Sequence, residues 1–181
     1  MATVFVLLGL TLQRLLHHVS ARAATALLVF VAVGAGSILV NLTFHVGALV
    51  VATDPAYAAP GTGGDALALL MLDLHHHGYV LGGVFFGLWL LPMGYLAYRS
   101  SMFPNALGVL LVVGCLAWIA DTAIAFALPD APAVVRDVLS VLTSIAEFGL
   151  LLYLLVRGVR TPQQRTGGPA PIAVAVRSGQ G

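Results

Sequence analysis

Residues 74–100, LHHHGYVLGGVFFGLWLLPMGYLAYRS, decide the fold of this chain. No charged side chain occurs from Gly78 to Tyr98. At about 1.5 Å per residue, a helix of this length crosses the roughly 30 Å hydrocarbon layer of a bilayer. Three histidines precede the apolar run and Arg99 follows it, so polar residues mark both of its ends. The stretch therefore predicts a membrane-spanning helix.

The composition of the whole chain also indicates a membrane protein. Of the 181 residues, 60% are hydrophobic and 8% are charged, and the mean hydropathy is +1.00. A soluble domain of this size cannot bury so much apolar surface in its core. The net charge of +1 gives no clustered basic surface, so nucleic acid is not expected as a partner. Cys115 is the only cysteine, which excludes an internal disulfide and a cysteine-built metal site.

Apolar runs recur along the chain and predict an all-α fold, a polytopic transmembrane helical bundle of about five spans over residues 1–160. Ala66–Leu74 is expected as a short interfacial helix before the third span, and Pro92 is expected to kink that span by removing a backbone hydrogen bond. Residues 161–181 are rich in Gln, Arg, Gly and Pro, which predicts a disordered cytoplasmic tail. The expected spans are residues 2–16, 23–52, 75–98, 105–128 and 138–156.

The arginines predict how the bundle lies in the membrane. Every basic residue is an arginine, and only Arg136 falls at the end that we expect to face outward. Because short cytoplasmic loops collect arginine and lysine, the C-terminus is expected to be cytoplasmic. Five crossings then put the N-terminus outside, and the short first helix leads us to expect a further span upstream of Met1. The arginines at the cytoplasmic end are Arg14, Arg22, Arg99, Arg157, Arg160, Arg165 and Arg177.

From Tyr98 onward the chain resembles a family of bacterial multi-spanning membrane proteins known only as a domain of unknown function. The resemblance implies a fold of typically six spans, in agreement with the expected upstream span, and a location in the bacterial inner membrane. It implies no activity, substrate or catalytic residue, and the three consecutive histidines do not belong to the family pattern. The residues that carry it are Tyr98-Arg99-Ser100, Pro104, Leu107-Gly108, Asp121, Glu147 and LLVRGV at 154–159.

Ionisable side chains inside the predicted spans are the candidates for chemistry. An acid inside a bilayer costs about 2.5–3.5 kcal/mol on insertion scales, so Asp121 and Glu147 are expected to face the bundle interior. Counted from the outer helix ends, His45 and Asp121 lie at similar depth, His76 lies at the rim and Glu147 lies deeper. These four residues are therefore expected to form a polar cluster within the membrane.

Three roles for such a cluster remain open: a structural clamp, proton or ion handling, and metal binding. The clamp is favoured, because hydrogen bonds between polar side chains commonly join membrane helices, at about 0.6 kcal/mol each. Consecutive histidines point about 100° apart on a helix, and the sequence contains no HxxxH or HExxH pattern. The weak candidates for metal ligands are His45, His75, His77 and Asp121, and no cofactor is expected.

Four glycines in the third span form two small-xxx-small spacings, Gly78 with Gly82 and Gly83 with Gly87. Such spacings let another helix approach closely, either from within the chain or from a second copy. Together these patterns favour a non-enzymatic integral membrane protein with a structural or partner-binding role in the lipid bilayer. A homo-oligomer or another membrane protein as partner stays open. The alternatives are a small proton- or ion-coupled transporter and an intramembrane His/Asp metal-binding protein.

Overall fold

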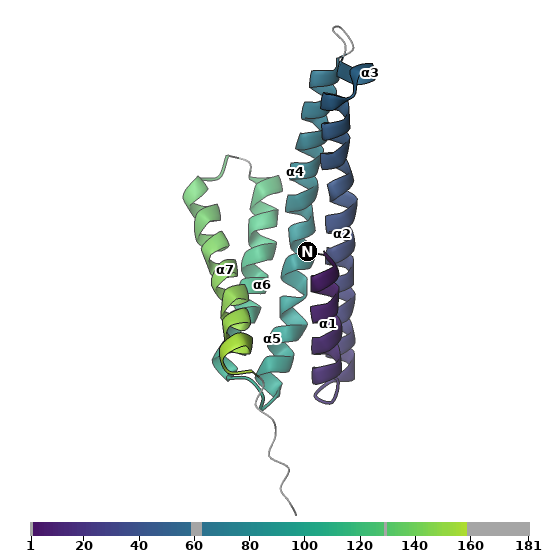
Figure 1. Cartoon of the computed structure of the whole chain (residues 1–181). Coiled ribbons are helices and arrows are strands. Elements are labelled where there is room, and N and C mark those ends of the chain that lie inside the picture. Colours follow the sequence, from purple (N-terminus) through teal and green to yellow (C-terminus); the bar gives the residue numbers. More distant parts are fainter. Residues whose placement is uncertain (1, 59–62, 129, 159–181) are drawn as a thin grey trace, which may run out of the picture.

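The computed structural model describes residues 2–58, 63–128 and 130–158, and this part of the chain is a bundle of helices without a strand (Figure 1). The predicted all-α class is therefore confirmed. Residues 159–181, where the tail was predicted, lie outside the described residues. The helices are α1 (Ala2–Leu16), α2 (Ala21–Thr53), α3 (Pro55–Ala58), α4 (Gly64–Leu88), α5 (Leu90–Arg99), α6 (Asn105–Ala127) and α7 (Ala133–Val156).

Four helical segments are long and apolar enough to cross a membrane. They are α2, the continuous segment Gly64–Arg99 formed by α4 and α5, α6, and α7. Helix α1 is apolar but has only 15 residues, which is about 22 Å at 1.5 Å per residue and less than the hydrocarbon thickness. By length and composition, the described chain thus has four segments able to cross a membrane and one shorter apolar helix, which fits a multi-spanning membrane protein.

The structure bears on two expectations for the third predicted span, the separate helix at Ala66–Leu74 and the effect of Pro92. Helix α4 begins at Gly64, so Ala66–Leu74 is part of the long helix rather than a separate interfacial one, because no helix breaker follows Leu74 before the apolar run. The helix is interrupted at Trp89, between α4 and α5. Pro92 accounts for this break, since it has no N–H to donate to the carbonyl four residues earlier.

Helix α1, helix α2, the segment formed by α4 and α5, helix α6 and helix α7 alternate in direction along the chain, so four arginines gather at one end of the bundle, which we call the arginine end (Figure 1). They are Arg14 in the last turn of α1, Arg22 in the first turn of α2, Arg99 at the end of α5 and Arg157 after α7. We call the opposite end the far end; Arg136 lies there, in the first turns of α7.

At the far end, α2 and α4 extend beyond α6 and α7 as a two-helix projection (Figure 1). The His77 ring lies 6.4 Å from the ring of Phe126, next to the last residue of α6, so the histidine run is level with the end of α6. The projection therefore comprises residues 46–53 of α2 and 64–74 of α4. It exposes apolar side chains, among them Leu49 at 61% and Leu69 at 62%.

The packed core lies toward the arginine end. Leu90, Met93 and Leu96 of α5 are completely buried there, together with Leu16 of α1 and Leu27 of α2. The turn between α5 and α6 closes this end, because the Tyr153 hydroxyl of α7 donates a hydrogen bond to the Met102 carbonyl at 3.2 Å.

Candidate functional site

Helices α2 and α4 are joined by a reciprocal pair of hydrogen bonds. The Asn41 amide Nδ2 donates to the carbonyl oxygen of His75 at 2.8 Å, and His75 Nδ1 lies 3.0 Å from the carbonyl oxygen of Asn41. Because a carbonyl only accepts, this contact places the proton of the neutral ring on Nδ1 and leaves Nε2 as an acceptor. Asn41 is 5% exposed. The pair therefore fixes the register of the two longest helices.

Because Gly78 has no side chain, the Asn41 carboxamide can pack directly against α4 at this position. A Cβ atom at Gly78 would lie 2.5 Å from Asn41 Oδ1, and one at Gly82 would lie 3.7 Å from the Ser37 side chain. Asn41 Oδ1 is buried and has no hydrogen-bond partner in the part of the chain that the structure describes. The first of the two glycine spacings thus packs on α2.

We expect Gly78→Ala and Asn41→Ala to be strongly non-additive. Alone, Gly78→Ala should cost about 1–3 kcal/mol, because the new methyl group displaces a buried carboxamide that is hydrogen-bonded to the His75 carbonyl. Asn41→Ala should cost about 1 kcal/mol for the lost hydrogen bond. In the double variant the methyl group enters space that Asn41 has vacated, so the cost of Gly78→Ala should largely disappear. Unfolding of the four proteins in detergent measures the coupling; strict additivity would contradict this packing.

His45 of α2 and the adjacent His76 and His77 of α4 lie near the Asn41–His75 pair. The rings of His45 and His75 lie 5.0 Å apart between their centroids, and those of His76 and His77 lie 5.5 Å apart. His77 Nδ1 lies 2.8 Å from the Asp73 carbonyl, one turn earlier in α4. His45 and His75 are therefore the two imidazoles from different helices that the fold brings together.

Glu147 of α7 and Trp118 of α6 form a polar contact between their helices. Trp118 Nε1 donates to Glu147 Oε1 at 3.0 Å. The indole also packs on α4, because a Cβ atom at Gly87 would lie 2.6 Å from Trp118 Cβ and one at Gly83 would lie 3.1 Å from the indole ring. The second glycine spacing thus packs on α6, and Trp118 links three helices.

Two further contacts join α6 to its neighbours at the far end. Arg136 Nε donates to Asp121 Oδ1 at 3.0 Å, with side chains that are 42% and 21% exposed. The Thr122 hydroxyl donates to the Val80 carbonyl of α4 at 3.3 Å. The ion pair joins α6 to α7 near the connection between them and so holds this corner in place.

The structure gives the four residues of the predicted polar cluster four different partners. His45 contacts His75, His76 contacts His77, Asp121 pairs with Arg136 and Glu147 accepts from Trp118. Of the predicted metal candidates, His45 and His75 lie together, whereas His77 is turned toward Phe126. Among the described residues, no group of three or more His, Cys, Asp or Glu side chains is placed to hold a metal ion.

Sequence reasoning did not single out Asn41, Trp118, Thr122 or Arg136 as site residues. A signal for Asn41 existed, since an amide in an otherwise apolar span needs a partner on another helix. No such signal marks Trp118, because tryptophan in a span is also common at the membrane interface. Its role depends on the two glycines that face it.

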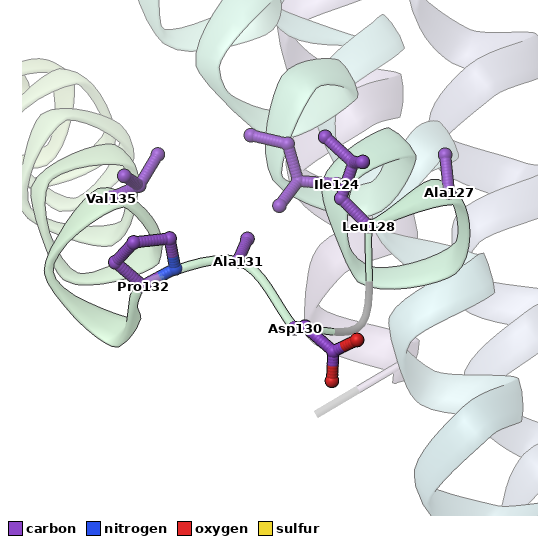
Figure 2. Close-up of a pocket in the computed structure, with 7 residues that line it drawn as sticks. All are labelled: Ile124, Ala127, Leu128, Asp130, Ala131, Pro132 and Val135. Atoms are coloured by element: carbon purple, nitrogen blue, oxygen red, sulfur yellow. The ribbon is translucent and has the colours of Figure 1, made fainter.

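The corner between α6 and α7 contains an open hollow of about 540 Å³. Figure 2 shows that Ile124, Leu128 and Val135 contribute apolar side chains to it, and Asp130 from the connection contributes the one charged group among its lining residues. The histidines and Glu147 do not line it. The hollow is therefore separate from the polar contacts between the helices.

Residues 1–158 match the family described as a domain of unknown function, DUF4386. The chain belongs to this family. The match covers the early helices as well as the segment from Tyr98 onward, so the DUF4386 resemblance is confirmed and extends over the described bundle. Tyr98 and Gly108, two of the residues on which the resemblance was based, lie in contact, because a Cβ atom at Gly108 would lie 2.8 Å from the Tyr98 nitrogen. No curated protein and no solved structure matches the chain.

Proposed function

We propose that this DUF4386 protein is a non-enzymatic integral membrane protein with a structural or partner-binding role. The observation that carries the proposal is the pairing of its polar side chains across helices. Asn41 with His75, Trp118 with Glu147, and Asp121 with Arg136 each join two neighbouring helices. Interhelical hydrogen bonds of this kind stabilise membrane bundles, and no further role is needed to explain why these residues are there.

Proton- or ion-coupled transport is less well supported. A carrier needs polar groups that continue from Glu147 to the arginine end. In the described residues, that path meets the apolar core, where Leu90, Met93 and Leu96 are completely buried. Metal binding is favoured only by the 5.0 Å approach of His45 and His75, and elemental analysis of untagged protein would reveal it.

We propose that the arginine end faces the cytoplasm of a bacterial cell, with the bundle in the inner membrane. The distribution of Arg14, Arg22, Arg99 and Arg157 against the single Arg136 supports this orientation. Reporter fusions after Arg157 test it, and a periplasmic signal would reverse the assignment.

The structural role is tested with Glu147→Gln and Asp121→Asn. The amide of glutamine still accepts from Trp118, so we expect Glu147→Gln to change the free energy of unfolding by no more than about 0.6 kcal/mol. For Asp121→Asn we expect a loss of about 1 kcal/mol, since the asparagine oxygen can still accept a hydrogen bond from Arg136. Both variants should accumulate in cells at the wild-type level.

A proton-leak measurement in proteoliposomes tests whether the protein transports protons. With a pH-sensitive dye inside, the wild-type protein and Glu147→Gln are expected to give the same proton leak as empty vesicles. A leak that the wild-type protein produces and Glu147→Gln abolishes would replace the structural proposal with proton transport.

A further inference from the structure

An apolar groove runs between α5 and α6 on the surface that faces the bilayer. It has a volume of about 350 Å³, and its walls include Leu91, Tyr95 and Tyr98 of α5 and Val109 and Val113 of α6. Tyr98 and Val109 are each 53% exposed. From Leu91 to Tyr98 the groove extends about 10 Å along the helix axis at 1.5 Å per residue, which accommodates part of a lipid acyl chain.

Two glycines form the floor of this groove. A Cβ atom at Gly94 would lie 2.8 Å from the Gly108 carbonyl oxygen, and one at Gly108 would lie 2.8 Å from the Gly94 carbonyl oxygen. The two helix backbones therefore lie in direct contact, with no space for a side chain at either glycine. Because the floor is backbone, the groove is a fixed feature of the fold rather than a gap that a side chain closes by changing rotamer.

The positively charged side chain of Arg99 lies at the rim of the groove. The Arg99 guanidinium lies 6.0 Å from the centroid of the Tyr95 ring, within the range of a cation–π contact. The acidic residues of the sequence lie elsewhere: on the projection, at the far end and, for Glu147, within α7. No carboxylate therefore neutralises Arg99 or the neighbouring arginines in the described part of the arginine end.

We propose that this groove binds an anionic phospholipid. One acyl chain lies in the groove against Tyr98 and Val109, and the headgroup phosphate pairs with Arg99 at the membrane surface. Arginine at the end of a span attracts anionic headgroups, and a basic site between helices adds chain contacts to that attraction. A zwitterionic lipid has the same chains but adds a positive group to an end that is already positive, so an anionic headgroup is preferred. The proposal depends on the membrane location and not on the structural role proposed above.

The experiment uses the full chain in nanodiscs of phosphatidylcholine containing phosphatidylglycerol, with native mass spectrometry to count the lipids retained. We expect the wild-type protein to retain one phosphatidylglycerol in preference to phosphatidylcholine. Arg99→Gln should lower this occupancy about fivefold, the effect of one arginine near an anionic surface, and Arg99→Lys should restore most of it. Val109→Trp, a change at an exposed position, should fill the groove and lower retention of either lipid.

Arg14→Gln is the matched control, because it removes the same charge from the same end of the bundle but from α1. Its occupancy should stay within twofold of wild type. Equal losses in Arg14→Gln and Arg99→Gln would mean a general attraction of the arginine end and would overturn the site, as would full retention in Val109→Trp. A dimer that Val109→Trp dissociates would assign the groove to a second copy instead. Thermal unfolding confirms that each variant is folded.

Discussion

Replacing Gly108 with alanine is expected to destabilise the bundle by about 2–3 kcal/mol, near the upper end of the usual cost of overpacking. The added methyl group would lie 2.8 Å from two backbone atoms of α5, the Gly94 carbonyl oxygen and the Tyr98 nitrogen. Backbone atoms within a helix cannot rotate away, so α5 and α6 must separate. That separation would loosen the packing around Leu90 and Leu96 in the core.

Gly36→Ala is the control for this prediction, since a Cβ atom at Gly36 meets nothing within 4 Å. The same substitution there should be neutral or should stabilise α2 by up to about 1 kcal/mol, the difference in helix propensity between glycine and alanine. Both variants are compared by thermal unfolding in the same detergent. If Gly108→Ala unfolds at or above the wild-type temperature, the close approach of α5 and α6 is wrong.

The glycines also show what the sequence could predict and what it could not. Spacing predicted that Gly78, Gly82, Gly83 and Gly87 face neighbouring helices, because small residues four apart share one side of a helix. It could not predict that one pair meets α2 and the other α6. That division depends on which helices flank α4, and the order of spans along a chain does not determine their arrangement in the membrane.

The polar residues show a second limit to what the sequence can predict, namely which side chains contact one another. Depth along a helix can be counted from the sequence only from the expected span ends, and this count put His45 deeper than the histidine run. The rings of His45 and His75 instead lie 5.0 Å apart, because α4 begins at Gly64 rather than at residue 75. Rotation about the helix axis cannot be counted with the same accuracy, since each residue turns by about 100°. Asp121 consequently pairs with Arg136 on the α7 side of α6, and Glu147 accepts from Trp118. Equal depth therefore did not show which side chains meet.

Trp118→Ala is expected to destabilise the protein by about 3 kcal/mol, at the lower end of the range for removing a large aromatic side chain, because Trp118 is only partly buried. The indole fills the space left by Gly83 and Gly87 and is bonded to Glu147. Removing it opens a gap between α4 and α6 and leaves Glu147 without its donor. We expect lower cellular abundance and a clear decrease in the unfolding temperature.

Trp118→Phe separates packing from hydrogen bonding. Phenylalanine keeps most of the ring against the two glycines but has no N–H, so the loss should approach the 0.6 kcal/mol typical of one interhelical hydrogen bond. A cycle that combines Trp118→Phe with Glu147→Leu isolates the coupling between the two side chains. If that coupling is near zero while Trp118→Ala remains costly, the indole acts by shape alone. Glu147 would then carry an intramembrane carboxyl group that the clamp does not explain, and proton handling would become the better account of it.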